Sequence, residues 1–234
     1  MKTNQNNLSI LYRSEHLNLA NSFELKIAKI KQNFESIFHK KGQVIFSEGN
    51  IPKGLFYVES GKIKIYKYGS DGKEQIIRIA KKGDFLGYKN LLTGNCYNAS
   101  ATVIEDAILT YIPKTDFQNL FKNDADFADM LTQLLCYDLT DMEEKVVSIA
   151  YKPVRGRLAE TLLELIEVYK ENEESSDNAI VLSRDDLAKL IGTAKETLIR
   201  LLTEFKTEKL IRSDGKAIWV LDPVRLMKID NLYN

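Results

Sequence analysis

The stretch SRDDLAKLIGTAKETLIRLL, residues 183–202, predicts two short helices joined by a tight turn. Ser183 can cap the first helix, and Asp186 stands where a capping box has its acid. Apolar residues recur at helical spacing and give each helix a buried face: Leu187, Leu190 and Ile191, then Leu198, Leu201, Leu202 and Phe205. Gly192 can supply the positive φ of the turn, and the second helix should open at Thr193 or Ala194. This is the pattern of a helix-turn-helix.

The outward side of the second helix carries residues that suit DNA recognition. Arg200 can bond guanine O6 and N7, and Glu196 can accept a hydrogen bond from the cytosine amino group. Phosphate contacts are expected from residues with a cation or a hydroxyl: Arg184, Thr193, Lys195, Thr197 and Lys216. The alternative is that Glu196 and Arg200, at i and i+4, only pair on a solvated face. The segment 210–220 favours DNA binding, because it predicts a β-hairpin wing whose Lys216 can reach a phosphate.

Composition is that of an ordinary soluble protein and excludes several classes. The 234 residues are 44% hydrophobic and 28% charged, and 33 basic side chains balance 33 acidic ones, so net charge neither requires nor excludes nucleic acid. No stretch approaches the ~20 apolar residues of a membrane span, and the N-terminus lacks a secretory signal. Two cysteines are too few for a disulfide framework. We therefore expect a cytoplasmic protein that does not enter membranes.

The first half of the chain predicts an antiparallel β-sandwich or barrel over residues 40–113. Nine of the 12 glycines lie between residues 42 and 94, among short apolar runs, as expected for turns between strands. The runs are 43–46, 55–58, 62–66, 75–79 and 101–112. Residues 69–72 (Gly-Ser-Asp-Gly) join two of them as a hairpin would.

Residues 124–150 predict one long helix without Gly or Pro. Its apolar residues repeat in alternating steps of three and four, the heptad pattern of a coiled coil. The expected dimer seam is Ala128, Leu131, Leu135, Asp138, Met142, Lys145 and Ile149. The alternative is a helix that packs on its own β domain. We favour a homodimer, since a long helix between two domains with polar residues in its seam can fix partner number.

Pro153 ends this helix and separates it from another amphipathic helix. The predicted fold class is therefore α+β, with three parts. Residues 1–123 form N-terminal helices and an effector or sensor β-roll, residues 124–150 form the dimerisation helix, and residues 151–234 form the winged helix-turn-helix. In residues 1–39 no function is evident, but several apolar side chains should pack helices against the β domain: Phe23, Leu25, Ile27, Ile30 and Phe34.

This arrangement resembles the Crp/Fnr superfamily of bacterial transcription regulators. The resemblance covers roughly residues 40–222 and rests on residues 61–66, 83–87, 98–101 and 182–211. It implies a cyclic-nucleotide-binding-like domain, a homodimer, double-stranded promoter DNA and RNA polymerase as partners, and no enzymatic activity. It also implies that Glu196 and Arg200 contact base edges, that Lys195 contacts bases or phosphate, and that Thr197 and Arg184 contact phosphate.

The residues that bind cyclic AMP in such regulators are replaced here. Those members have a Glu after Phe-x-Gly and an Arg-Ser that holds the cyclic phosphate. This sequence has Tyr88-Lys89 and Asn98-Ala99 instead, and Met142-Glu143 where a Thr-Ser pair should face the adenine. We do not expect cyclic AMP to bind in the usual way. A pocket for another small-molecule effector would use Gly87, Tyr88, Lys89, Asn98, Ala99, Ser100 and Met142.

Other branches of the family bind a metal cofactor, either an iron–sulfur cluster or haem. An iron–sulfur cluster is not expected, because no cysteine precedes Cys96. Haem remains an alternative, since axial ligation needs one or two of His, Cys or Met. The formal ligands are His16, His39, Cys96, Met130, Cys136 and Met142. Two rival functions remain. One is a cupin-like metal enzyme, which would need clustered histidines that this sequence lacks. The other is a cyclic-nucleotide-type module that regulates a protein partner.

Overall fold

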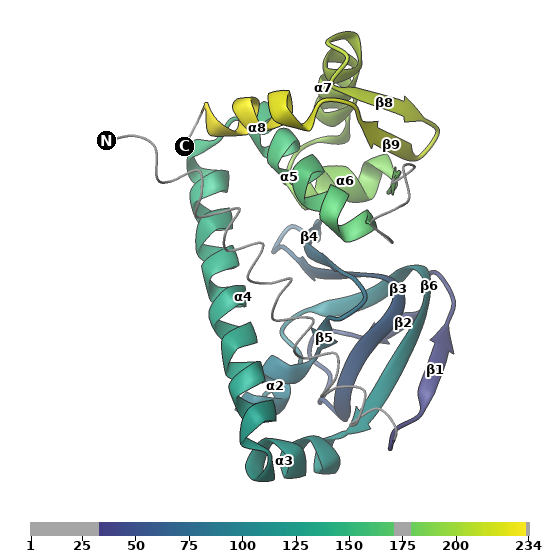
Figure 1. The fold of residues 1–234 in the computed structure, drawn as a ribbon, viewed down its shortest axis with the longest axis vertical. Helices are drawn as coiled ribbons and strands as arrows, with labels where there is room; N and C mark the ends of the chain where they lie inside the picture. The colour runs from purple at the N-terminus through teal and green to yellow at the C-terminus, as the bar shows by residue number, and fades with distance from the viewer. Residues whose placement is uncertain (1–32, 171–178, 233–234) are drawn as a thin grey trace. The chain divides into compact units, whose positions relative to one another are not determined.

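The computed structural model describes residues 33–170 and 179–232 of an α+β chain (Figure 1). The first elements are β1 (Ser36–His39), β2 (Val44–Phe46), β3 (Gly54–Tyr68), β4 (Glu74–Ala80), β5 (Phe85–Leu86), α2 (Tyr88–Thr93), β6 (Ser100–Pro113) and α3 (Lys114–Asn123). They are followed by α4 (Ala125–Tyr151), α5 (Val154–Tyr169), β7 (Ile180–Val181), α6 (Arg184–Ile191), α7 (Lys195–Thr207), β8 (Ile211–Asp214), β9 (Ala217–Val220) and α8 (Pro223–Asn231). This order confirms the predicted fold class.

The large sheet has six strands in the order β1-β6-β3-β4, with β2 also paired to β6 and β5 to β3. β1 runs antiparallel to β6, and β5 antiparallel to β3. The predicted hairpin is present, because the Gly69 N–H donates to the Lys73 carbonyl at 2.8 Å and Gly72 has a φ of 74°. The β-roll thus begins at residue 36, four residues earlier than the predicted sandwich.

Gly61 corrects the expectation that each glycine of this region marks a turn. It lies inside β3, so the predicted runs 55–58 and 62–66 form one strand of 15 residues. Its φ is +83°, and a Cβ here would lie 2.3 Å from the Asp106 carbonyl oxygen on β6. Glycine is needed because the neighbouring strand approaches so closely.

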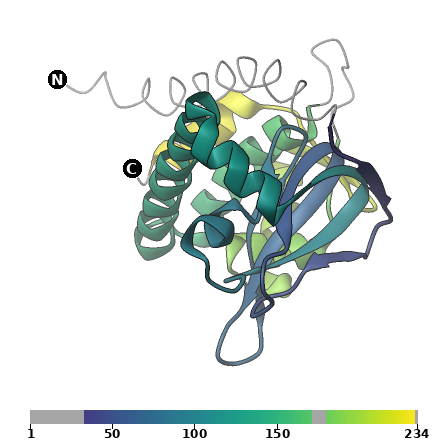
Figure 2. The same cartoon turned by 90° about the horizontal axis from the view of Figure 1, so that it is seen from below.

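The core of the β domain lies between strands and helices. Side chains from β3, β5 and β6 pack against α2, α3 and the first turns of α4, which lie along one side of the strands (Figure 2). This core contains Leu55, Tyr57, Phe85, Tyr88, Leu91, Ile112, Phe117, Phe127, Met130 and Leu131. Phe34 packs partly buried against it, as predicted, but from a bend before β1 and not from a helix. Phe23, Leu25, Ile27 and Ile30 lie outside the described residues.

The C-terminal elements match the local predictions closely. Pro153 separates α4 from α5, and the Ser183 hydroxyl accepts a 3.0 Å hydrogen bond from the Asp186 N–H at the start of α6. Gly192 ends α6 with a φ of 72°. β7, β9 and β8 form a second, antiparallel sheet. Its inner face contributes Ile180, Ile211 and Ile218 to a core with the buried leucines of α5, α6 and α7.

The described chain divides into two compact units. One contains residues 33–63, 81–98 and 102–135, and the other contains 64–80, 99–101, 136–170 and 179–232. No helix in the described part of the chain has the length and apolar character needed to cross a membrane.

Candidate nucleic-acid interface

Helix α7 has one buried and one exposed face. Leu198, Leu201, Leu202 and Phe205 are buried on the inner face. The outer face exposes Lys195, Glu196, Ile199, Arg200 and Thr203, while Thr193 and Thr197 at its margin are partly buried. The helix starts after Ala194, whose side chain cannot cap it. The structure thus brings the predicted base-contacting pair, Glu196 and Arg200, onto one solvent-facing surface.

Arg200 is oriented by a neighbour that the sequence analysis did not consider. Its Nη1 donates to Glu204 Oε1 at 2.5 Å, one turn further along α7. Glu204 is also held by Arg155 Nη1 at 3.3 Å, and Arg155 in turn bonds Glu208 at 2.8 Å. The i,i+4 pair that Arg200 forms on this solvated face is thus with Glu204 rather than with Glu196. This chain of charges engages one guanidinium nitrogen of Arg200, while Glu196 is exposed to solvent.

Lys195 lies near the acidic end of α6. Its Nζ is 3.8 Å from Asp185 Oδ1, and Lys189 Nζ is 2.8 Å from Asp185 Oδ2. The hydrogen bond from Lys189 lowers the pKa of the Asp185 carboxyl and raises that of the Lys189 ammonium. Lys195 is exposed and Lys189 is partly buried, and Asp185 itself is exposed. The long contact of Lys195 with Asp185 is therefore a weak surface pair that a phosphate can replace.

Arg184 supports the wing from within. Its Nη2 donates to the Gly215 carbonyl at 3.0 Å, and its Nη1 donates to the Lys216 carbonyl at 3.2 Å. Burial lowers the pKa of this guanidinium. Two of its donors are thus used inside the chain, while the Lys216 side chain beside the turn is exposed. This geometry favours a positioning role for Arg184 over the phosphate contact that the sequence suggested.

The wing also presents an aromatic and cationic pair that the sequence analysis missed. Arg212 on β8 lies opposite Trp219 on β9, and its guanidinium carbon is 4.1 Å from the indole centroid. Both side chains point away from buried Ile218, so strand alternation could have found them. Stacking on an aromatic ring orders an exposed arginine.

The residues predicted to form an effector pocket fall into different environments. Tyr88 is packed into the hydrophobic core of the β domain. Gly87 precedes α2 with a φ of 89°, Lys89 is partly buried, and Asn98 is exposed. Ala99 and Ser100 are buried, whereas Met142 is exposed.

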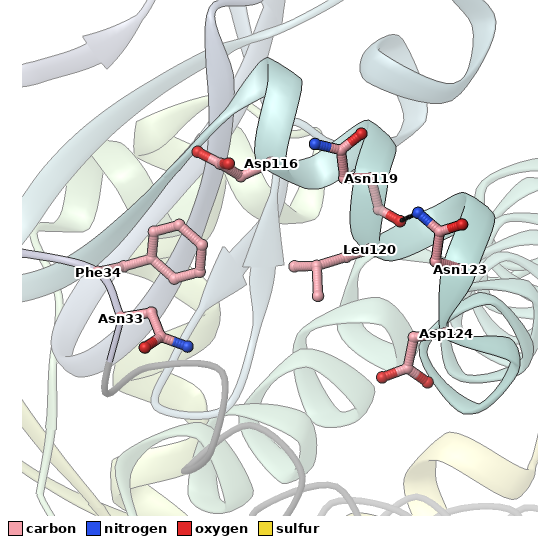
Figure 3. Close-up of a pocket in the computed structure, with 7 residues that line it drawn as sticks. All are labelled: Asn33, Phe34, Asp116, Asn119, Leu120, Asn123 and Asp124. Carbon is pink, nitrogen blue, oxygen red and sulfur yellow. Dashed lines mark hydrogen bonds between the residues drawn. The ribbon is translucent and has the colours of Figure 1, made fainter.

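A cavity of about 590 Å³ lies elsewhere in the β domain (Figure 3). It is lined by Asn33, Phe34, Asp116, Asn119, Leu120, Asn123 and Asp124. Asn123 Nδ2 donates to the Asn119 carbonyl at 3.0 Å, and Asp124 Oδ1 accepts from the Phe127 N–H at 3.0 Å at the start of α4. These polar groups stabilise helix ends. None of the predicted effector residues lines the cavity.

Helix α4 matches the predicted long helix, and two residues of the predicted seam, Met142 and Ile149, are exposed on it. Leu131 is fully buried in the chain's own core, so its assignment to a dimer seam is wrong. Asp138 and Lys145 are partly buried, and Lys145 Nζ bonds Asp141 at 2.9 Å and the Ile77 carbonyl at 3.3 Å. Ala128 and Leu135 are also partly buried. The exposed apolar stripe consists of Leu139, Met142, Val146 and Ile149.

The formal haem ligands are dispersed. Met130 belongs to the hydrophobic core, Cys96 and Cys136 are exposed thiols, and His16 lies outside the described residues. Burial lowers the pKa of the His39 imidazole. Within residues 33–170 and 179–232, no three His, Cys, Asp or Glu side chains are grouped to hold a metal ion.

Comparison with known proteins supports both halves of this arrangement. Residues 37–124 match the cyclic nucleotide-binding domain, and residues 156–229 match the Crp-like helix-turn-helix domain. The protein is a DNA-binding transcription regulator of the Crp/Fnr type. Regulators of this family are not enzymes, in agreement with the sequence analysis.

Its relatives are distant but extend over most of the chain. A CRP-like cAMP-activated global transcriptional regulator of Mycobacterium tuberculosis is 24% identical over 203 residues, covering 86% of this chain and 91% of the relative. The fumarate and nitrate reduction regulatory protein of Vibrio cholerae is 26% identical over 191 residues, covering 81% and 76%. Among solved structures, FixK2 of Bradyrhizobium japonicum aligns with a TM-score of 0.74 at 23% identity, covering 84% of this chain and 97% of FixK2.

Proposed function

We propose that this regulator is a cytoplasmic homodimer that reads a near-palindromic site in double-stranded promoter DNA and then contacts RNA polymerase. Residues 1–123 would form the sensor, 124–150 the dimerisation helix and 151–234 the DNA-binding domain. The observation that carries the proposal is the exposure of Glu196 and Arg200 together on a helix whose opposite face is buried.

In the proposed complex α7 lies in the major groove. Arg200 bonds guanine O6 and N7, and Glu196 accepts from a cytosine amino group. Its ion pair with Glu204 limits the freedom of Arg200 before binding, which lowers the entropy lost on contact. Lys195, Thr193, Thr197 and Lys216 contact phosphates and set the register, and Arg184 holds the wing turn for Lys216.

The proposed dimer forms along the exposed stripe of α4, Leu139, Met142, Val146 and Ile149. These residues follow the three-and-four spacing of a coiled-coil seam, and pairing two copies removes their apolar surface from water. The two recognition helices would then lie ~34 Å apart, one turn of DNA, so that the protein's two-fold axis matches an inverted repeat.

The proposed effector is a small molecule other than cyclic AMP, or none. Asn98-Ala99 supplies no cation for a cyclic phosphate, and Glu143 adds negative charge on α4. The relative from Mycobacterium tuberculosis is described as cAMP-activated, and the proposal is that this chain differs from it in its effector. Calorimetric titration with cyclic AMP should give no heat of binding, and tight binding would overturn this part of the proposal.

Haem remains the alternative within the same family, as a gas or redox sensor. Cys96 and Cys136 are free thiols at the surface of the chain. Protein purified from a haem-replete host should be colourless if our proposal holds, and a Soret band would favour the haem alternative. A cyclic-nucleotide-type module acting on a protein partner would instead give no DNA binding at all.

The direct experiment is selection from a pool of duplexes with a randomised 30-base-pair core. The proposal expects enrichment of an inverted repeat with half-sites about one helical turn apart. Enrichment of a single half-site would refute the dimeric mode, and absence of any enriched sequence would refute sequence-specific DNA binding.

A further inference from the structure

Arg157 on α5 connects two helix ends within the C-terminal unit. Its Nη1 donates to the Lys152 carbonyl at 2.9 Å, at the junction between α4 and α5. Its Nε donates to the Ile191 carbonyl at 3.1 Å, and its Nη2 donates to the Gly192 carbonyl at 3.2 Å. One guanidinium therefore links the junction to the turn that precedes α7.

The three acceptors explain why an arginine is needed. Each belongs to the C-terminal end of a helix, where carbonyls lack intrahelical donors and the helix dipole favours a cation. The planar guanidinium fork can serve acceptors on two sides at once. A lysine ammonium carries the same charge but cannot bridge them from one position, because its donors converge on a single atom.

The junction end of this link is itself well anchored. Lys152 is buried, and its Nζ bonds Glu160 at 2.9 Å and Asp230 at 2.6 Å. The Ser148 hydroxyl donates to the same Glu160 carboxylate at 2.5 Å. These bonds join the last turn of α4 to α5 and α8. Arg157 thus connects the helix-turn-helix to the α4–α5 junction, which is itself bonded to α5 and α8.

The other end of the link decides where α7 starts. The Gly192 and Thr193 N–H groups both donate to the Ala188 carbonyl, at 3.0 and 3.1 Å, and Ala194 occupies the N-cap position of α7 without a side-chain hydrogen bond. Glu196 lies four residues and Arg200 eight residues beyond Gly192. A small rotation of the turn therefore moves both proposed base contacts together.

We propose that Arg157 is a positioning residue for sequence discrimination, which acts by fixing the turn before α7 rather than by contacting bases. This assignment rests on the proposed function, since it concerns how α7 is aimed at DNA. Loss of the link should reduce binding to the selected site and leave phosphate-driven binding to unrelated DNA unchanged, because the phosphate contacts are spread over the domain.

The test compares Arg157→Lys with the same change at Arg225. Arg225 is the matched control, because its Nη1 donates to one carbonyl, that of Glu208, at 3.1 Å. Affinity is measured for a duplex enriched by the wild type and for a scrambled duplex of the same composition. Hydrogen exchange is measured at the Gly192 and Thr193 amides. Circular dichroism checks folding, and Arg157→Gln, which keeps a planar amide, replaces the lysine variant if it fails to fold.

We expect Arg157→Lys to weaken binding to the enriched duplex about tenfold or more, with scrambled binding within about twofold of wild type. The two amides should exchange at least about tenfold faster, and Arg225→Lys should change neither readout. If wild type prefers the enriched duplex and Arg157→Lys keeps the same ratio of enriched to scrambled affinity, the Arg157 assignment alone is refuted. Equal loss on both duplexes would make Arg157 a phosphate contact, and a wild type without discrimination would refute the proposed function itself.

Discussion

Leu139→Ala should weaken the dimer without unfolding the chain. Leu139 lies in the exposed stripe of α4 and is 62% exposed in the single chain. The change removes three carbon atoms, and each buried carbon stabilises by ~0.8 kcal/mol. If the exposed 62% becomes buried on pairing, the loss is about 1.5 kcal/mol per chain and about 3 kcal/mol per dimer. The dimer dissociation constant should rise roughly 100-fold.

Sedimentation equilibrium measures this constant directly, and two control variants test the register. Gln133→Ala changes an exposed residue that lies nearly half a turn (on average about 150°) from the stripe residues, and should leave the constant unchanged. Lys145→Ala changes a residue of the originally expected seam, which here bonds Asp141 and the Ile77 carbonyl within the chain. Dimerisation weakened by Lys145→Ala but not by Leu139→Ala would refute our reasoning, as would a wild type that stays monomeric.

Three further outcomes are expected. Burial alone would lower the pKa of Lys152, but its hydrogen bonds with Asp230 and Glu160 outweigh burial and raise the pKa. The stabilisation by Lys152 therefore holds below pH 10.5 and is lost above that pH. The midpoint temperature of thermal unfolding should fall more steeply above that pH in wild type than in Lys152→Met, and parallel curves would contradict this. Gly61→Ala should lower the free energy of unfolding, measured in urea, by about 2 kcal/mol more than Gly83→Ala. Gly83 has a similar positive φ, but a Cβ there would meet open space. Equal losses in the two variants would exclude the clash with Asp106. Arg184→Met should weaken binding to all duplexes alike and reduce the salt slope by about one, as lost support for Lys216 implies, and a loss confined to the selected duplex would contradict it.

Local features of the site were predictable because they depend on neighbours in the sequence. Ser183 caps a helix through an amide three residues away, and Gly192 is required by the backbone of its own turn. The outward placement of Glu196 and Arg200 follows from helical periodicity alone. These elements need no knowledge of the rest of the chain.

Features that depend on distant residues were not predictable. Gly61 looked like a turn, because nothing in its neighbourhood reveals the close approach of Asp106. Tyr88 occupies a motif position that suggested an effector contact, but its ring fills the core. Arg157 and Arg184 bond carbonyls more than 30 residues away, and a sequence gives no sign of such partners.

The seam of α4 shows a different limit. The helix has two apolar faces, one packed on its own β domain through Phe127, Met130 and Leu131 and one exposed at Leu139 and Val146. A heptad pattern fits both faces with a shift of one residue. Periodicity can therefore predict that the helix buries an apolar stripe, but not which stripe packs within the chain.

The central claim is that Arg200 reads a base pair in the major groove. Affinities of wild type and Arg200→Ala should be measured for the selected duplex and for its single-base variants in each half-site. We predict a loss of about 1–3 kcal/mol, roughly 5- to 150-fold, on the selected duplex, with selectivity relaxed at one base pair of each half-site. A uniform loss on every duplex, with selectivity intact at each position, would contradict the claim and make Arg200 a phosphate contact.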